Sequence, residues 1–101
     1  MLYHSTRGLD GSRSFSEVLH SGLAEDGGLF VPETVPLLTT DNINKWRHHS
    51  YEELAVEIIS LFSGDCFSRS ELTDIVYQSY SGFQHTLKSP LIKLEDNHYF
   101  L

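Results

Sequence analysis

The 101-residue sequence predicts one small α+β domain, mainly helical, with three to four helices and a short β-sheet or hairpin built from the N- and C-terminal segments. Three observations predict this class. Serine-initiated capping boxes recur before apolar helical patterns, β-prone runs lie at both ends, and the length suffices for one modest core. The sequence has no internal repeat and no long linker, so we expect a single domain over residues 1–101.

The first predicted elements are a short strand and a short helix. Residues 2–6 are β-prone. Ser14 and Glu17 form an S-x-x-E capping box, in which the serine hydroxyl accepts from the N–H of Glu17 and the glutamate reaches back. The helix that follows is expected to be about two turns long and to end at Gly22. Residues 29–31 are then expected to form a buried strand or extended segment.

Three more helices are predicted downstream. Asp41 can cap a short helix that runs through Trp46. A second capping box begins at Ser50, ahead of the clearest amphipathic pattern, and a third begins at Ser68. The apolar stripes expected to face the core are Leu54, Ala55, Ile58, Leu61 and Phe62 in the first long helix, and Leu72, Ile75, Val76 and Tyr80 in the second.

After Pro90 the pattern changes from helical to β-like. Residues 91–94 and 98–101 are short apolar runs, and the polar residues 95–97 between them suit a tight turn. We therefore expect a hairpin. Because the sequence stops within an apolar run, we also expect this chain to be part of a longer one.

The charge and the cysteine count exclude several classes of function. Seven basic against 14 acidic side chains give a net charge of −7, which argues against partners such as nucleic acid or an anionic membrane. Cys66 is the only cysteine, so an intramolecular disulfide is impossible and a reducing compartment is favoured. We expect a cytoplasmic protein.

Histidines and lysines supply few candidates for chemistry. Adjacent residues on a helix point about 100° apart, so His48 and His49 cannot easily bind one metal ion, and we expect no metal. A lysine that bonds covalently to a cofactor usually needs a desolvated pocket, which the surroundings of Lys45, Lys88 and Lys93 do not predict. Motifs such as G-x-G-x-x-G, the Walker loop and G-x-S-x-G are missing from the sequence.

One segment with possible chemistry follows the first strand. Ser5, Thr6, Arg7 and Gly8 place two hydroxyls, a guanidinium and a glycine together. Such a group can hold an anion, because arginine forks around phosphate or carboxylate and the backbone can form a nest of donors. The alternative is an ordinary strand end with a surface arginine, and the residue types alone favour this alternative.

The other segment spans residues 23–32 and contains Asp26, Gly27 and Gly28 before an aromatic strand. A rigid turn next to such a strand could shape the wall of a pocket. The alternative is a glycine-dependent chain reversal in the core, which the residue types alone again favour.

These segments resemble the opening of threonine synthase. The resemblance lies in Tyr3–Gly8 and Ser21–Pro32, and it continues through Trp46, residues 50–55 and the block Pro90–Leu94. It covers nearly the whole chain in the same order and spacing. We therefore identify the sequence as similar to the N-terminal domain of a threonine synthase or of a threonine-synthase-like protein.

The resemblance implies a fold type II pyridoxal-phosphate enzyme that converts O-phospho-L-homoserine and water into L-threonine and phosphate. In that family the cofactor lysine lies in a Phe-Lys-Asp context, followed by a glycine-rich loop, and neither occurs here. This stretch is then expected to hold no catalytic and no cofactor-binding residue and to be inactive alone. It would cover the active site beside two larger catalytic domains, with Ser5, Thr6 and Arg7 near the substrate and with Asp26, Gly27 and Gly28 as a structural motif.

Two alternatives stay open. The parent protein can be a threonine-synthase-like lyase that acts on related phosphorylated substrates, or the chain can be a free-standing protein-interaction module. In a fragment of the enzyme, Leu91, Leu94, Tyr99 and Leu101 are expected to lose partners because the catalytic domains are absent. The open strand edge then predicts self-association or a mobile hairpin.

Overall fold

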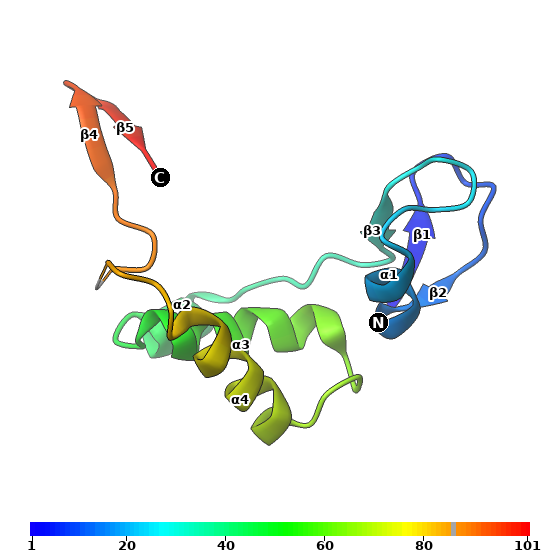
Figure 1. Ribbon diagram of the computed structural model, residues 1–101, viewed down its shortest axis with the longest axis horizontal. Coiled ribbons are helices and arrows are strands. Elements are labelled where there is room, and N and C mark those ends of the chain that lie inside the picture. The colour runs from blue at the N-terminus through cyan, green and yellow to red at the C-terminus, as the bar shows by residue number, and fades with distance from the viewer. Residues whose placement is uncertain (86) are drawn as a thin grey trace.

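The computed structural model of this chain describes residues 1–85 and 87–101, which form four helices and two small sheets. Figure 1 shows a curved arrangement, in which the N-terminal sheet and a C-terminal hairpin stand at opposite ends of a layer of helices. The mainly helical α+β class is thereby confirmed. In chain order, the elements are β1 (Leu2–Ser5), β2 (Arg13–Ser14), α1 (Phe15–Ser21), β3 (Phe30–Pro32), α2 (Thr40–Trp46), α3 (Tyr51–Ser63), α4 (Arg69–Tyr80), β4 (Ile92–Glu95) and β5 (His98–Phe100).

Three of the helices begin at the serines that the sequence predicted. Ser14, Ser50 and Ser68 have extended backbone, and each side chain accepts from the backbone N–H three residues later. The glutamate at that third position accepts from the serine N–H in return, at 2.7, 2.7 and 2.9 Å, so all three capping boxes are complete. α1 ends at Gly22, as predicted.

The start of α2 differs from the prediction. Its N-cap is Thr39, and Asp41 lies within the first turn. Thr39 Oγ1 accepts from the Asn42 N–H at 3.2 Å, while the Asn42 Oδ1 accepts from the Thr39 N–H at 3.0 Å. Asparagine therefore replaces glutamate in this capping box, and Asp41 sits where a carboxylate interacts favourably with the helix dipole.

The N-terminal sheet is antiparallel, with the strand order β2–β1–β3. β1 pairs with β3 from Tyr3 opposite Pro32 to Ser5 opposite Phe30. The sequence predicted both strands but not β2, because a two-residue strand has no periodic pattern of its own. Tyr3 connects this sheet to the helices: its side chain is buried, and its hydroxyl donates to the Phe62 carbonyl of α3 at 2.8 Å.

The C-terminal residues form a separate hairpin. The prediction that both ends of the chain build one sheet is therefore wrong. β4 and β5 pair with each other, with an irregularity between Lys93 and Glu95. The predicted tight turn is present, and Asn97 in it takes a left-handed backbone with φ of 62°, which asparagine tolerates better than most residues. The helices lie between the two sheets in Figure 1, so the strands of one sheet do not reach those of the other.

The core is small and lies where α3 packs on α4. Val56, Leu72 and Val76 form its buried centre. The predicted stripe is therefore confirmed at Leu72 and Val76, but Ile58 and Ile75 are 39% and 45% exposed. Because a contact between two helices buries a narrow stripe, the outer members of a wider apolar stripe remain in solvent. The partly buried residues around this centre are Ala55, Ile59, Phe67 and Tyr80.

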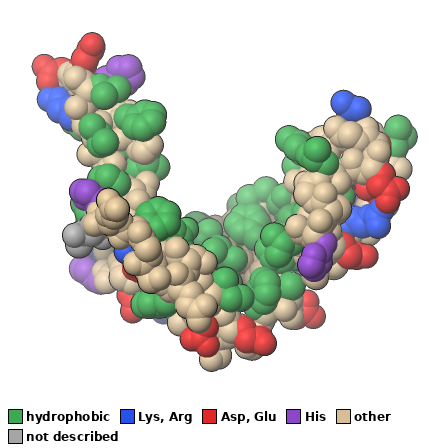
Figure 2. Space-filling view, in the orientation of Figure 1, with side chains coloured by type: hydrophobic (Ala, Val, Ile, Leu, Met, Phe, Trp, Pro, Cys, Tyr) green, Lys and Arg blue, Asp and Glu red, His purple; other side chains and the backbone are tan. Residues whose placement is uncertain are grey.

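The chain is open for its size. Its radius of gyration is 16.5 Å, against about 13 Å for a compact domain of 100 residues. Its accessible surface of 7699 Å² exceeds that of an average monomer of this mass by roughly 1,900 Å². Figure 2 shows hydrophobic side chains spread over the hollow side of the curve. Within the described residues, no helix has both the length and the apolar character needed to cross a bilayer.

Candidate functional site

The two segments that stood out in the sequence meet beside the N-terminal sheet. Just after β1, the Thr6 N–H donates to the Leu29 carbonyl at 2.8 Å, and the Leu29 N–H donates to Thr6 Oγ1 at 3.0 Å. These bonds continue the pairing of β1 with β3 and bring residues 5–8 against residues 26–28. We call these two segments together the Ser5–Asp26 loop cluster.

The Asp26 carboxylate is the centre of the loop cluster. Its Oδ1 accepts from the Ser5 hydroxyl at 2.6 Å and from the Gly28 N–H at 2.9 Å, and its Oδ2 accepts from the Leu9 N–H at 3.0 Å. The buried Ser5 hydroxyl depends on this bond. That hydroxyl, together with the backbone N–H groups, holds the pKa of Asp26 below its ordinary value against the effect of desolvation. Asp26 is therefore an ionised anchor held by neutral donors.

The loop cluster orients Arg7 through neutral groups, so the positive charge of its guanidinium is not neutralised there. The Arg7 N–H donates to Ser5 Oγ at 3.1 Å, and its Nη1 donates to the backbone carbonyl of Asp26 at 2.9 Å. A Cβ at Gly27 would lie 3.1 Å from Nη1, so the guanidinium rests against bare backbone. Arg7 is exposed, and no carboxylate among residues 1–85 and 87–101 forms an ion pair with it. Its charge is available to an incoming oxyanion.

The geometry requires both glycines of the loop cluster. Gly27 has a φ of +77°, which disfavours any side chain. Gly28 is buried, and a Cβ there would lie 2.2 Å from Ser5 Oγ and 3.0 Å from Asp26 Oδ1. Locally, then, these residues form a chain reversal that depends on glycine. That the turn forms a pocket wall in a larger protein stays a prediction.

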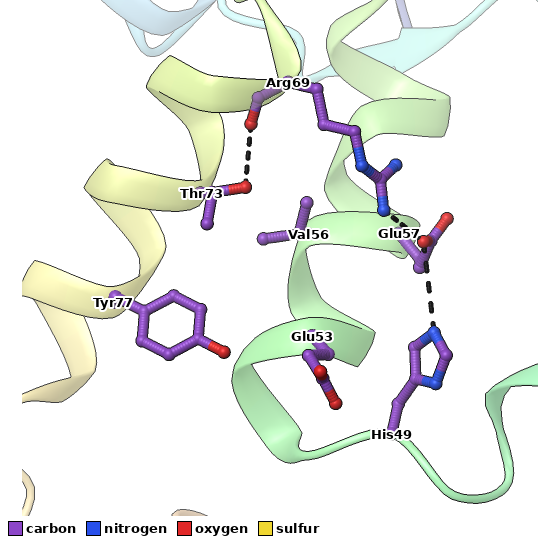
Figure 3. Close-up of a pocket in the computed structure, with 7 residues that line it drawn as sticks. All are labelled: His49, Glu53, Val56, Glu57, Arg69, Thr73 and Tyr77. Atoms are coloured by element: carbon purple, nitrogen blue, oxygen red, sulfur yellow. Dashed lines mark hydrogen bonds and ion pairs between the residues drawn. The ribbon is translucent and has the colours of Figure 1, made fainter.

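A second polar site, which the sequence did not indicate, lies between α3 and α4. The cleft has a volume of about 240 Å³. In Figure 3, Glu57 stands between Arg69 and His49. Glu57 accepts a hydrogen bond from Arg69, and His49 Nε2 lies 4.0 Å from the same carboxylate. The hydrogen bond that Arg69 donates to Glu57 raises the pKa of the Arg69 guanidinium. The other lining residues are Glu53, Val56, Thr73 and Tyr77.

This cleft is best explained as a polar connection between two helices. Its arginine and one of its glutamates neutralise each other, and the hydroxyl of Thr73 donates to the Arg69 backbone carbonyl at 2.8 Å. Glu57 and Arg69 are 12 positions apart on successive helices. No local pattern operates over that separation, so only the packing of α3 on α4 reveals the pair.

The remaining candidates are not gathered into a reactive site. Within the described residues, no three His, Cys, Asp or Glu side chains form a group that could hold a metal ion. Lys45 is exposed on α2. Lys88 Nζ lies 3.6 Å from Glu52 Oε1, and Lys93 Nζ lies 2.6 Å from Asp96 Oδ1. The three lysines therefore stand in three separate places.

Comparison with known proteins identifies the family. The family model described as "Threonine synthase N terminus" matches residues 2–80. The chain belongs to the threonine synthase N-terminal family. The match includes both segments of the Ser5–Asp26 loop cluster, so the resemblance seen in the sequence is confirmed.

Relatives and a solved structure of the family agree with this match. Threonine synthase from Schizosaccharomyces pombe is 41% identical over 95 residues, which are 93% of this chain and 18% of that protein. Threonine synthase-like 2 from Mus musculus is 37% identical over 97 residues, which are 95% and 20%. The X-ray structure of PLP-bound threonine synthase from Brucella melitensis has a TM-score of 0.89 at 34% identity, over 98% of this chain and 21% of that one. The chain thus spans about a fifth of the length of these family members.

Replacing Gly28 by alanine should disrupt the loop cluster. The added Cβ would collide with Ser5 Oγ, which cannot move without losing its bond to Asp26. We expect the free energy of unfolding, measured by chemical denaturation, to fall by about 1–3 kcal/mol. Gly11→Ala is the matched control, since nothing lies within 4 Å of its Cβ. Equal stabilities for the two variants would contradict the role given to Gly28.

The lowered pKa of Asp26 predicts a sensitivity to acid. A carboxyl group whose pKa is lower in the folded state stabilises the fold at pH values above its unfolded-state pKa, here 3.8. This contribution is lost as the pH falls through the lower, folded-state pKa. Asp26→Asn should lower the Tm at neutral pH and flatten the fall in Tm between about pH 5 and pH 2. Asp74→Asn, which removes an exposed carboxylate from α4, should keep the wild-type slope. A wild-type slope in Asp26→Asn would refute this assignment.

Proposed function

We propose that residues 1–101 are the N-terminal domain of a threonine synthase, the pyridoxal-phosphate enzyme that converts O-phospho-L-homoserine and water into L-threonine and phosphate. The match of the family model over residues 2–80 carries this proposal, and the likeness to a PLP-bound threonine synthase supports it. Because the chain spans about a fifth of its relatives, the activity belongs to the whole protein. This domain would cover and shape the active site and hold the catalytic domains.

The described residues do not fit a site for pyridoxal phosphate. A lysine that bonds to this cofactor must first lose its proton, usually in a desolvated pocket. Here Lys88 donates to the Tyr80 carbonyl at 3.1 Å and lies beside Glu52. Lys93 is paired with Asp96, and the third lysine is exposed on α2. We therefore assign the cofactor and the catalytic lysine to polypeptide outside these residues.

Within this proposal, Arg7 is the residue assigned next to the substrate. O-phospho-L-homoserine carries a phosphate and a carboxylate, and a guanidinium binds either in a forked geometry. Ser5 and Thr6 are assigned to the same place, as residues that position Arg7. Their hydroxyls are used inside the loop cluster, on Asp26 and on the Leu29 N–H. The accessible charge of Arg7 supports this division of roles.

A threonine-synthase-like lyase that acts on related phosphorylated substrates is the second candidate. Threonine synthase-like 2 from Mus musculus covers this chain about as fully as the threonine synthases do. The residues of this chain therefore favour neither. A free-standing interaction module is the third candidate, favoured only by the exposed apolar hairpin. In all three cases we infer a cytoplasmic location, supported by the single cysteine.

The reaction is tested with the full-length parent protein, purified with pyridoxal phosphate. Supplied with O-phospho-L-homoserine, it should form threonine and phosphate in equal amounts, measured by amino-acid analysis and a phosphate assay. The 101-residue chain alone should form neither, because it offers no suitable lysine. Phosphate release without threonine would favour the second candidate. Release of neither product by the full-length protein would reject both enzyme candidates.

Arg7→Ala in the full-length protein should lower kcat/KM by roughly 10-fold or more, because one charge-assisted contact to an anionic group is lost. Arg7→Lys should retain part of the activity, since it keeps the charge but not the fork. Arg47→Ala removes another exposed arginine, at the end of α2, and should leave the kinetics unchanged. Wild-type kinetics in Arg7→Ala would show that Arg7 does not contact the substrate.

A further inference from the structure

The hydroxyl of Tyr3 forms the hydrogen bond that joins the N-terminal sheet to the helical layer. Within the described residues 1–85 and 87–101, no other hydrogen bond or ion pair joins residues 1–33 to α2, α3 or α4. Along the chain, the two parts are connected by residues 33–39, which lie outside helices and strands. Figure 1 shows this extended segment and places the sheet beside the end of α3. One polar contact of Tyr3 therefore fixes the sheet on the helices.

Both ends of this hydrogen bond are well defined. Phe62 lies in the last turn of α3, where carbonyl oxygens have no partner within the helix. Tyr3 donates to the Phe62 carbonyl at 2.8 Å. The Tyr3 side chain is buried, with its ring 6.0 Å from the ring of Phe15. Burial raises the pKa of the Tyr3 hydroxyl, so the hydroxyl keeps the proton that it donates.

Strand β1 connects this anchor to Arg7 in steps of two residues. Tyr3 lies in the central strand of the sheet, opposite Arg13 of β2 and Pro32 of β3. Because alternate residues of a strand point to the same face, Ser5 follows Tyr3 on the buried side. Ser5 Oγ accepts from the backbone N–H of Arg7 at 3.1 Å. A shift of Tyr3 is therefore transmitted through Ser5 to the backbone of Arg7.

The backbone around Arg7 offers no substitute for its guanidinium. The four backbone N–H groups of residues 6–9 all donate within the loop cluster, at 2.8 to 3.1 Å. None of these groups is left to form a nest of donors for an anion. Binding of an anion therefore depends on where the fold places the guanidinium.

We propose that Tyr3 is a positioning residue for Arg7: its bond to the Phe62 carbonyl fixes β1 on the helices, and β1 places the guanidinium where the anionic group of the substrate binds. This inference rests on the function proposed above, in which Arg7 contacts O-phospho-L-homoserine. Because Tyr3 is buried, it acts through Ser5 and Arg7. A misplacement of about 1 Å in such a group can cost ~100-fold in rate, so loss of the anchor should be visible in the kinetics.

Tyr3→Phe in the full-length protein tests the hydroxyl alone, because the ring stays beside Phe15. This variant should raise KM for O-phospho-L-homoserine by about 5-fold or more and keep kcat within about 2-fold, since the contact of Arg7 is weakened in the ground state and the transition state alike. A merely structural defect would lower the fraction of active enzyme, and therefore kcat, at an unchanged KM. Wild-type KM in Tyr3→Phe would overturn the proposal.

Tyr77→Phe is the matched control. It removes the hydroxyl of a tyrosine that is 47% exposed on α4, and it should leave KM and kcat unchanged. An increase in KM as large as that of Tyr3→Phe would count against a specific role of Tyr3.

A double-mutant cycle tests whether Tyr3 acts through Arg7. In the Arg7→Ala background, Tyr3→Phe should change kcat/KM by less than about 2-fold, because the group that Tyr3 positions is already missing. Independent sites have additive free energies, so their fold-changes multiply. Multiplied effects of the two substitutions would therefore overturn the proposal.

Phe15→Leu is a second variant, for the case in which Tyr3→Phe does not fold. It keeps the Tyr3 hydroxyl but removes the ring beside it, so KM should rise by about 2-fold or more while Arg7 is present. Wild-type KM in Phe15→Leu would then overturn the proposal.

The outcomes separate this inference from the proposed function. An impaired Arg7→Ala together with a wild-type Tyr3→Phe would overturn the role of Tyr3 and leave that of Arg7 standing. Wild-type kinetics in Arg7→Ala would overturn both roles. The assay of threonine and phosphate with the unaltered protein decides on the reaction independently of either residue.

Discussion

The burial of Tyr3 is the constraint on which the arrangement of this chain depends. The Tyr3 hydroxyl donates to the Phe62 carbonyl at 2.8 Å, across 59 positions of sequence, and burial raises the pKa of that hydroxyl. The Tyr3 ring lies 6.0 Å from Phe15, and the Phe15 ring lies 6.2 Å from Phe67. This aromatic row joins β1, α1 and the approach to α4. Since β1 leads directly into the Ser5–Asp26 loop cluster, the same row sets where that cluster stands relative to the helices.

Arg7 in the loop cluster differs from Arg13 and Arg69 in the groups that its guanidinium contacts. Arg13 forms two bonds to Asp10, at 3.1 and 2.7 Å, and Arg69 is paired with Glu57. Arg7 instead donates to a backbone carbonyl, while the neighbouring carboxylate of Asp26 is occupied by a hydroxyl and backbone N–H groups. A cation held in place by neutral groups keeps its attraction for an anion. This separation of the two charges is the chemical basis for assigning Arg7, and not Arg13 or Arg69, to a ligand.

The open shape and the small core have one explanation. Three buried residues, Val56, Leu72 and Val76, form the centre of the core, whereas a long row of large apolar side chains remains in contact with solvent. Small domains bury a limited fraction of their surface and have little stability to spare. A chain with this balance leaves much of its apolar surface in contact with solvent. The chain matches about a fifth of the length of each of these family members.

Features whose hydrogen bonds close within a few residues were predictable from the sequence alone. The capping boxes at Ser14, Ser50 and Ser68 belong to this group, because each joins positions three apart. The turn through Asn97 is equally local, because it depends on the backbone conformation of that residue. The threonine synthase family was likewise predicted from the order of the sequence blocks and was confirmed by the match over residues 2–80.

Which distant groups meet depends on the packing of the elements, which the sequence patterns did not predict. One helix contact selected Val56 over Ile58 for the core, and the helices between the two ends kept their strands in separate sheets. The bond from Ser5 to Asp26 spans 21 positions, so the sequence could name both residues as candidates but could not show that one holds the other. Contacts of this length depend on how β1, β3 and the helices pack, and a pattern along the chain does not contain that information.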